Sequence, residues 1–135
     1  MNVSVLDKYI KDRDADPAAP VEGEGTDDLG AFGWLRGVRE RAVMLELRRR
    51  DGSTTAFGYA WLEQAVFEPS EGITLHFGGK TVKIVGTNLN SESQPNIRLF
   101  AGIVRHRVPW IQEAAESDML AMSREATVIE RIDVK

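Results

Sequence analysis

The 135-residue chain contains no cysteine, which excludes disulfide bonds, thiolate metal ligands and a cysteine nucleophile. Histidine is also scarce, because His76 and His106 are the only two, and neither stands in the HxH or HExxH spacing of common metal sites. No apolar run approaches the roughly 20 residues that a membrane-spanning helix needs. The first residues lack a basic stretch followed by an apolar one, so no secretory signal is expected. These absences predict a soluble, cytoplasmic protein without a membrane span.

Sequence motifs for catalysis are missing as well. The chain has no G-x-S-x-G nucleophile elbow and no G-x-G-x-x-G nucleotide loop. Gly78-Gly79-Lys80-Thr81 matches only the end of a P-loop and lacks its upstream glycine, so it is better interpreted as a hairpin turn. The carboxylates show no pairing that points to acid–base chemistry. We therefore expect a non-enzymatic protein without a metal or cofactor.

Charge is unevenly distributed along the chain, whose formal net charge is −4. Residues 1–29 hold three basic and eight acidic side chains, and residues 111–135 hold three and six. Residues 30–110 hold eleven basic and seven acidic side chains. This pattern is compatible with ordinary solvated surfaces. A second interpretation is a basic middle region that meets an anion between two acidic ends.

The first 29 residues are predicted to form a short helix on a flexible acidic arm. Leu6, Tyr9 and Ile10 recur at helical spacing, but a helix this short is unstable unless it docks on another surface. Residues 14–28 are rich in proline, glycine, alanine and acid and lack apolar periodicity, which is typical of a linker. Residues 30–135 are expected to form a single β-rich domain.

The most distinct hairpin is predicted around Asp51-Gly52. Residues 42–50 and 54–67 alternate apolar and polar side chains on either side of this turn. The second stretch is long for one strand, so a bend or bulge is expected at Gly58.

Further extended segments follow at hairpin spacing. Residues 73–77 and 81–85 alternate on either side of Gly78-Gly79, and the polar residues 87–96 are predicted to form a loop. The alternation of residues 97–104 then predicts one more strand.

The last part of the chain changes period. Pro109 fits the first turn of a helix, and apolar residues at helical spacing extend that helix over 109–124. Residues 127–134 are β-branched and alternating, which indicates a closing strand. The predicted fold is α+β and mainly β: a small antiparallel barrel or roll of five to six strands with a C-terminal helix and a short N-terminal helix on a flexible arm.

The leading functional hypothesis is protein association, including self-association. Met44 and Phe100 are predicted to lie opposite the apolar side chains of their own strands. If only one face of the sheet is covered, both are exposed, and contiguous exposed apolar groups usually mark a partner surface. Leu6, Tyr9 and Ile10 on the arm are the other predicted partner-binding residues.

The alternative hypothesis is anion binding by a basic patch, with nucleic acid or a phosphorylated lipid as the ligand. Its residues cluster near strand ends and are Arg48, Arg50, Arg105, His106 and Arg107. Guanidinium groups that converge would suit phosphate, because their paired donors match its oxygens. Charges at strand ends also serve solubility and edge protection, and the sequence alone leaves the choice open.

Overall fold

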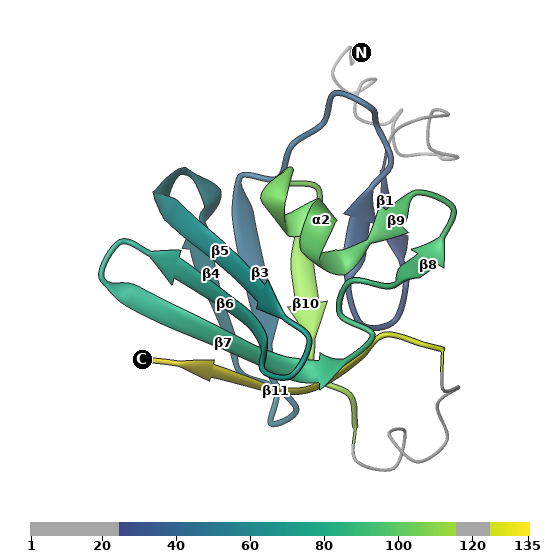
Figure 1. Cartoon of the computed structure of the whole chain (residues 1–135). Helices are drawn as coiled ribbons and strands as arrows, with labels where there is room; N and C mark the ends of the chain where they lie inside the picture. The colour runs from purple at the N-terminus through teal and green to yellow at the C-terminus, as the bar shows by residue number, and fades with distance from the viewer. Residues whose placement is uncertain (1–24, 116–124) are drawn as a thin grey trace.

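The computed structural model describes residues 25–115 and 125–135, which are mainly β-strand (Figure 1). The first strands and the connection between the large sheets are β1 (Thr26–Asp28), β2 (Gly33–Leu35), β3 (Met44–Arg48), β4 (Thr54–Gly58) and the 3₁₀ turn η1 (Tyr59–Trp61). The following elements are β5 (Leu62–Glu68), β6 (Gly72–Phe77), β7 (Lys80–Thr87), β8 (Glu92–Gln94) and β9 (Ile97–Arg98). The last are the helix α2 (Leu99–Val104), β10 (Trp110–Gln112) and β11 (Val128–Val134).

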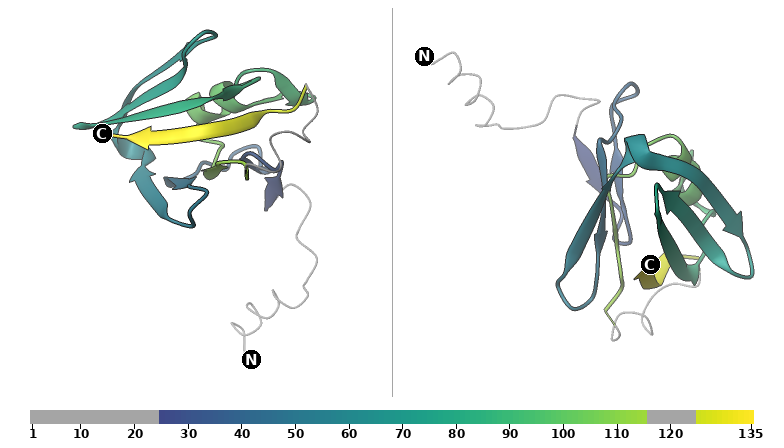
Figure 2. Two further views of the ribbon diagram at one scale, coloured as in Figure 1. Left: turned by 90° about the horizontal axis from the view of Figure 1, so that it is seen from below. Right: turned by 90° about the vertical axis from the view of Figure 1, so that its left-hand side faces the viewer.

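The strands form two larger sheets and two short ribbons. The larger sheets have the orders β10-β3-β4 and β11-β7-β6-β5, and the ribbons are β1-β2 and β8-β9. The two larger sheets lie in two layers, as Figure 2 shows. All pairings between named strands are antiparallel except that of β10 with β3, which is parallel. Within the described ranges no sheet closes into a barrel, so the mainly β prediction is confirmed and the barrel is not.

Both predicted hairpins are present. β3 and β4 pair around Asp51-Gly52, and β6 and β7 pair around Gly78-Gly79. Gly52 and Gly78 have φ angles of +93° and +57°, a region that glycine enters without the steric cost of a Cβ atom. Turn chemistry therefore fixes the register of both hairpins.

The bend predicted at Gly58 is also present, and it separates the two layers. β4 ends at Gly58, η1 turns the chain, and β5 continues in the other sheet. A Cβ atom on Gly58 would lie 3.2 Å from Cδ1 of Trp61. The residue thus leaves room for the indole to fold back over the end of β4.

The predicted strand over residues 97–104 is wrong beyond Arg98. Only Ile97–Arg98 is extended, and residues 99–104 form helix α2. Leu99 and Ile103 are buried at helical spacing, and Gly102 is buried with them. Over only six residues, the apolar pattern is compatible with the two-residue period of a strand and with the 3.6-residue period of a helix. Packing against the core favours the helix.

The helix predicted over 109–124 is absent from residues 109–115, the part of this range that the structure describes. Residues 110–112 form strand β10, in which Ile111 is buried and Gln112 is exposed, and residues 116–124 lie outside the described ranges. Pro109 precedes the strand, where the lack of an N–H group is tolerated and its carbonyl oxygen accepts a hydrogen bond from the Glu46 N–H. The closing strand predicted over 127–134 is confirmed as β11.

The boundary of the predicted linker is also corrected. Thr26–Asp28 form strand β1, which pairs with Gly33–Leu35, so the end of the segment assigned to the linker is β-strand. The predicted N-terminal helix lies outside the described residues.

The core lies between the two layers and is closed on one side by α2. Its fully buried side chains include Leu45, Leu47, Ile73, Leu75, Ile84, Leu99, Ile103, Ile111 and Ile129. The aromatic pair Phe57 and Phe77 stacks at 4.9 Å between ring centroids and joins β4 of one sheet to β6 of the other. Burial of the facing apolar surfaces is the main force that holds the two layers together.

Gly102 offers a direct test of how closely α2 packs. A Cβ atom there would lie 2.3 Å from Cζ3 of Trp34 and 2.9 Å from Cγ2 of Val108. We predict that Gly102→Ala lowers the free energy of unfolding by roughly 1–3 kcal/mol, because the added methyl group overpacks the interface. Gly79→Ala is the matched control, since its Cβ meets no atom within 4 Å. Equal midpoints for the two variants in urea denaturation would contradict this packing.

Candidate functional site

Four arginines line one groove of about 650 Å³, one from the end of β2 and three from the segment around α2. They are Arg36, Arg98, Arg105 and Arg107, and Asp27 is the only acidic side chain in the lining. This arginine groove lies between the β1-β2 ribbon and the β9–α2 connection, which are side by side in Figure 1.

One wall of the groove comes from the β1-β2 ribbon. Arg36 follows β2, and its Nε and Nη2 donate to Oδ1 of Asp27 in β1 at 3.1 and 2.8 Å. The backbone N–H of Arg36 donates to the carbonyl oxygen of Gly25 at 3.0 Å. The ribbon thus fixes the backbone and the guanidinium of Arg36 together.

The floor of the groove is built on Arg107. Its Nη1 donates to the carbonyl oxygen of Val38 at 3.0 Å, and its Nη2 donates to that of Leu35. Its guanidinium carbon lies 5.3 Å from the centre of the Trp34 ring, in cation–π geometry. Burial, together with the positive charge of Arg41, lowers the pKa of Arg107, and its buried Nε has no hydrogen-bond partner.

Arg98 and Arg105 stand at the two ends of α2. Both are exposed, and each uses one Nη1 group on a backbone carbonyl, of Asn90 at 3.1 Å and of Ala101 at 3.2 Å respectively. No carboxylate within residues 25–115 and 125–135 lies within 4.0 Å of either guanidinium or of Arg107. Among the described residues, Arg36 is the one groove arginine that forms an ion pair.

The five predicted anion-binding residues do not form one patch. Arg105 and Arg107 line the groove, whereas Arg48 lies on the outer side of β3. The guanidinium of Arg48 lies 4.5 Å from the centre of the Trp110 ring and donates to Oε1 of Glu46 at 3.0 Å. Arg48 is thereby engaged in contacts within its own sheet.

His106 faces away from this charge cluster. Its ring stacks on that of Tyr59, with 4.4 Å between the centroids, and its backbone has a φ of +60°. Its carbonyl oxygen accepts a hydrogen bond from the N–H of Ala42 at 2.7 Å. His106 therefore joins η1 to the segment before β3, a structural position outside the groove lining.

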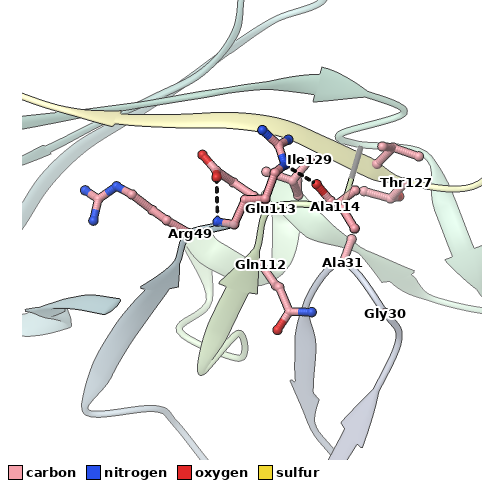
Figure 3. A pocket seen from close by; sticks show the side chains of 11 residues that line it. Gly30, Ala31, Arg49, Gln112, Glu113, Ala114, Thr127 and Ile129 are labelled. Carbon is pink, nitrogen blue, oxygen red and sulfur yellow. Dashed lines mark hydrogen bonds between the residues drawn. The ribbon is translucent and has the colours of Figure 1, made fainter. Parts of the chain in front are cut away.

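Arg50, the fifth predicted residue, links the two layers at another hollow (Figure 3). Its Nε donates to the carbonyl oxygen of Ala114 at 2.7 Å, and its Nη2 to that of Glu130 in β11 at 2.9 Å. The Glu113 carboxylate accepts from the N–H of Arg50 and of Ile132, each at 2.8 Å. We call these contacts the Arg50–Glu113 clamp.

A second surface feature is a cluster of exposed apolar side chains where β3 begins and η1 turns. Val43, Met44 and Trp61 are 79%, 44% and 68% exposed, and we call them the apolar corner. A Cβ atom on Gly58 would contact both Trp61 Cδ1 and the Met44 sulfur, at 3.2 and 3.7 Å, so these two side chains meet above that residue. Val43 precedes the strand and does not share the buried face of Leu45.

The backbone beneath the apolar corner is fixed by Tyr59. Its hydroxyl donates to the carbonyl oxygen of Val108 at 2.7 Å, and its N–H donates to the carbonyl oxygen of Val43 at 2.9 Å. Burial raises the pKa of Tyr59 well above its ordinary value of 10.0. The backbone beneath the corner is thus tied to the segments of Val108 and Val43.

The predicted partner-binding residues are separated by the fold. Met44 belongs to the apolar corner, whereas Phe100 is half-buried in α2 and packs on the Phe67 ring at 5.7 Å between centroids. Leu6, Tyr9 and Ile10 lie outside the described residues.

Sequence reasoning did not select Arg36, Arg98 or Trp61 as site residues. Arg98 and Arg105 are seven positions apart, and they flank a common element only once residues 99–104 are assigned to a helix. Trp61 lies in the 54–67 stretch, where alternation predicts extended chain beyond the bend at Gly58, whereas the structure places it in the turn η1.

Comparisons with other proteins and tests for known site types add no functional assignment. No family model, curated protein or solved structure matches the chain. The described residues contain no group of three metal-ligating side chains placed to share an ion. No helix in the same ranges has the length and apolar character for a membrane crossing.

We predict that a conservative substitution of Glu113 in the clamp destabilises the protein. Glu113→Gln replaces one of two carboxylate acceptors by a donor, which leaves a backbone N–H of Arg50 or Ile132 unpaired. We expect the free energy of unfolding to fall by about 1–3 kcal/mol in urea denaturation. Glu63→Gln, on the exposed side of β5, is the control and should change little. Equal stability of the two variants would show that the clamp contributes nothing.

Because Tyr59 is buried, we predict that the free energy of unfolding decreases at alkaline pH. Below pH 10.0 the phenol is neutral in both states, and above it the unfolded chain ionises while the buried phenol stays protonated. The unfolded state then binds fewer protons, so stability falls by about 1.4 kcal/mol per pH unit from this group. Comparing wild type with Tyr59→Phe by urea denaturation on both sides of that pH isolates the effect. Identical alkaline losses in both proteins would contradict it.

Proposed function

We propose that this chain is a non-enzymatic domain that associates with protein, including a second copy of itself, through the apolar corner. The observation that supports the proposal is the exposure of Trp61 beside Met44 and Val43 on a fixed backbone. Exposed apolar groups that stand together usually mark an interaction surface. Trp is also the residue type most enriched among the side chains that dominate binding energy.

The energetic reason lies in the area that a partner would cover. A Trp side chain buries about 150–250 Å², and removing most of that area from water contributes on the order of 3 kcal/mol. Because η1 is held by the Tyr59 hydroxyl, little conformational freedom is lost when a partner covers Trp61. A rigid aromatic anchor therefore favours association.

Strand edges beside the corner support self-association in particular. β4 and β5 are the terminal strands of the two larger sheets, and η1 connects them. A second copy would present the same corner and the same edges, as a two-fold interface requires. Leu6, Tyr9 and Ile10 remain proposed contributors from the N-terminal arm.

The alternative proposal of nucleic-acid or phosphorylated-lipid binding lacks support in its original form. Arg48 is stacked on Trp110, Arg50 belongs to the clamp, and His106 packs on Tyr59. Only Arg105 and Arg107 of the original set share a surface.

If the chain self-associates through the apolar corner, its molar mass in solution should depend on Trp61. Light scattering of the full chain over a concentration series should show a dimer that Trp61→Ser shifts toward monomer, because the variant loses the aromatic anchor. Val38→Ser is the matched control, since Val38 is 82% exposed and is not part of the corner. A wild-type protein that stays monomeric at every concentration would overturn self-association. A dimer unaffected by Trp61→Ser would overturn the role of the corner.

A further inference from the structure

We propose that the arginine groove is a binding site for a small phosphate-bearing anion, with Arg98 and Arg105 as its ligands and with Arg36 and Arg107 as fixed positive charges beside them. The groove is separate from the apolar corner, so this inference does not depend on the proposed association. In Figure 1 its elements β1, β2 and β9 lie on the right, whereas the β4–β5 connection lies on the left.

Charge imbalance is the first argument. The lining holds four guanidinium groups and a single carboxylate, although the whole chain has a formal net charge of −4. A general excess of basic residues therefore does not explain the cluster. Like charges brought together in a concave surface repel one another, and a bound anion relieves that repulsion.

Unused hydrogen-bond donors are the second argument. A guanidinium has five N–H donors, and Arg98 and Arg105 each give only one Nη group to a backbone carbonyl. Arg36 already shows the relevant geometry, because its Nε and Nη2 both donate to one carboxylate oxygen of Asp27. The paired N–H donors of the Arg98 and Arg105 guanidinium groups suit the terminal oxygens of a phosphate in the same way.

Preorganisation is the third argument. Arg107 is held by the carbonyl oxygens of Val38 and Leu35 and by the face of Trp34, which keeps its charge at the floor. Arg98 and Arg105 are about 10 Å apart along the axis of α2, given the rise per residue of an α-helix. Long side chains from its two ends can meet over a ligand with more than one phosphate.

The lining favours a small anion over a nucleic-acid strand. Trp34 is only 9% exposed and lies beneath Arg107, and it is the only aromatic residue in the lining. Proteins that hold single strands offer exposed aromatic faces on which bases stack. The acidic net charge also contrasts with the basic domains typical of nucleic-acid binding.

Titration calorimetry of the full chain with inorganic pyrophosphate tests this site. We expect binding that weakens as salt is raised, and a loss of affinity of about tenfold or more in Arg105→Ala, because charged hydrogen bonds are removed. Arg98→Ala should lose affinity similarly. Arg39→Ala is the matched control, since Arg39 is exposed and does not line the groove, and it should bind as wild type does.

Additional variants and ligands in the same calorimetry experiment distinguish the possible outcomes. Arg105→Lys keeps the charge but removes the fork, so it should bind more weakly than wild type, and its thermal melt verifies folding. Orthophosphate should bind more weakly than pyrophosphate if the ligand spans both ends of α2. No binding of pyrophosphate, or equal binding by the Arg98, Arg105 and Arg39 variants, would overturn the proposal. Tighter binding of a single-stranded oligonucleotide that grows with its length would replace the small anion by a nucleic acid.

Discussion

A single buried hydrogen bond connects the parts of the molecule on which both candidate surfaces depend. The Tyr59 hydroxyl donates to the carbonyl oxygen of Val108, and the donor and acceptor belong to segments far apart in the sequence. Tyr59 begins the turn that carries Trp61, and Val108 directly follows the arginine at the floor of the groove. This contact thus links the turn that carries the apolar anchor to the segment that carries part of the cationic cluster.

The two surfaces differ in how their side chains are held. Trp61 stands on a turn between sheets and projects into solvent, where a partner gains from covering apolar area. In the groove, backbone carbonyls anchor Arg98, Arg105 and Arg107, and the Asp27 carboxylate anchors Arg36, so the charges are placed before any ligand arrives. The first arrangement favours a broad contact with another macromolecule, and the second favours directional recognition of a small group.

Local signals in the sequence were sufficient for much of the fold. Asp51-Gly52 and Gly78-Gly79 specify tight turns, and alternation on both sides of each turn places the strands. The bend at Gly58 and the strand over 128–134 were predictable for the same local reasons. The helix at 99–104 and the strand at 110–112 could not be predicted from local signals, because each is short. The helix packs against Trp34 and the strand pairs with β3, and both partners are distant in the sequence. The grouping of Arg36 with Arg98 depends on that same distant packing, whereas the exposure of Met44 follows from local alternation.

The parallel pairing of β10 with β3 has a consequence for how the chain reaches this structure. β3 and β4 can form as soon as their turn has been synthesised, but the other side of β3 stays open until β10 emerges much later. Such non-local pairing is slow, because a long loop must close before any stabilising contact is made. Until β10 pairs with it, the edge of β3 that carries Leu45 and Leu47 lacks its strand partner, and unpaired strand edges make partly folded chains prone to aggregate.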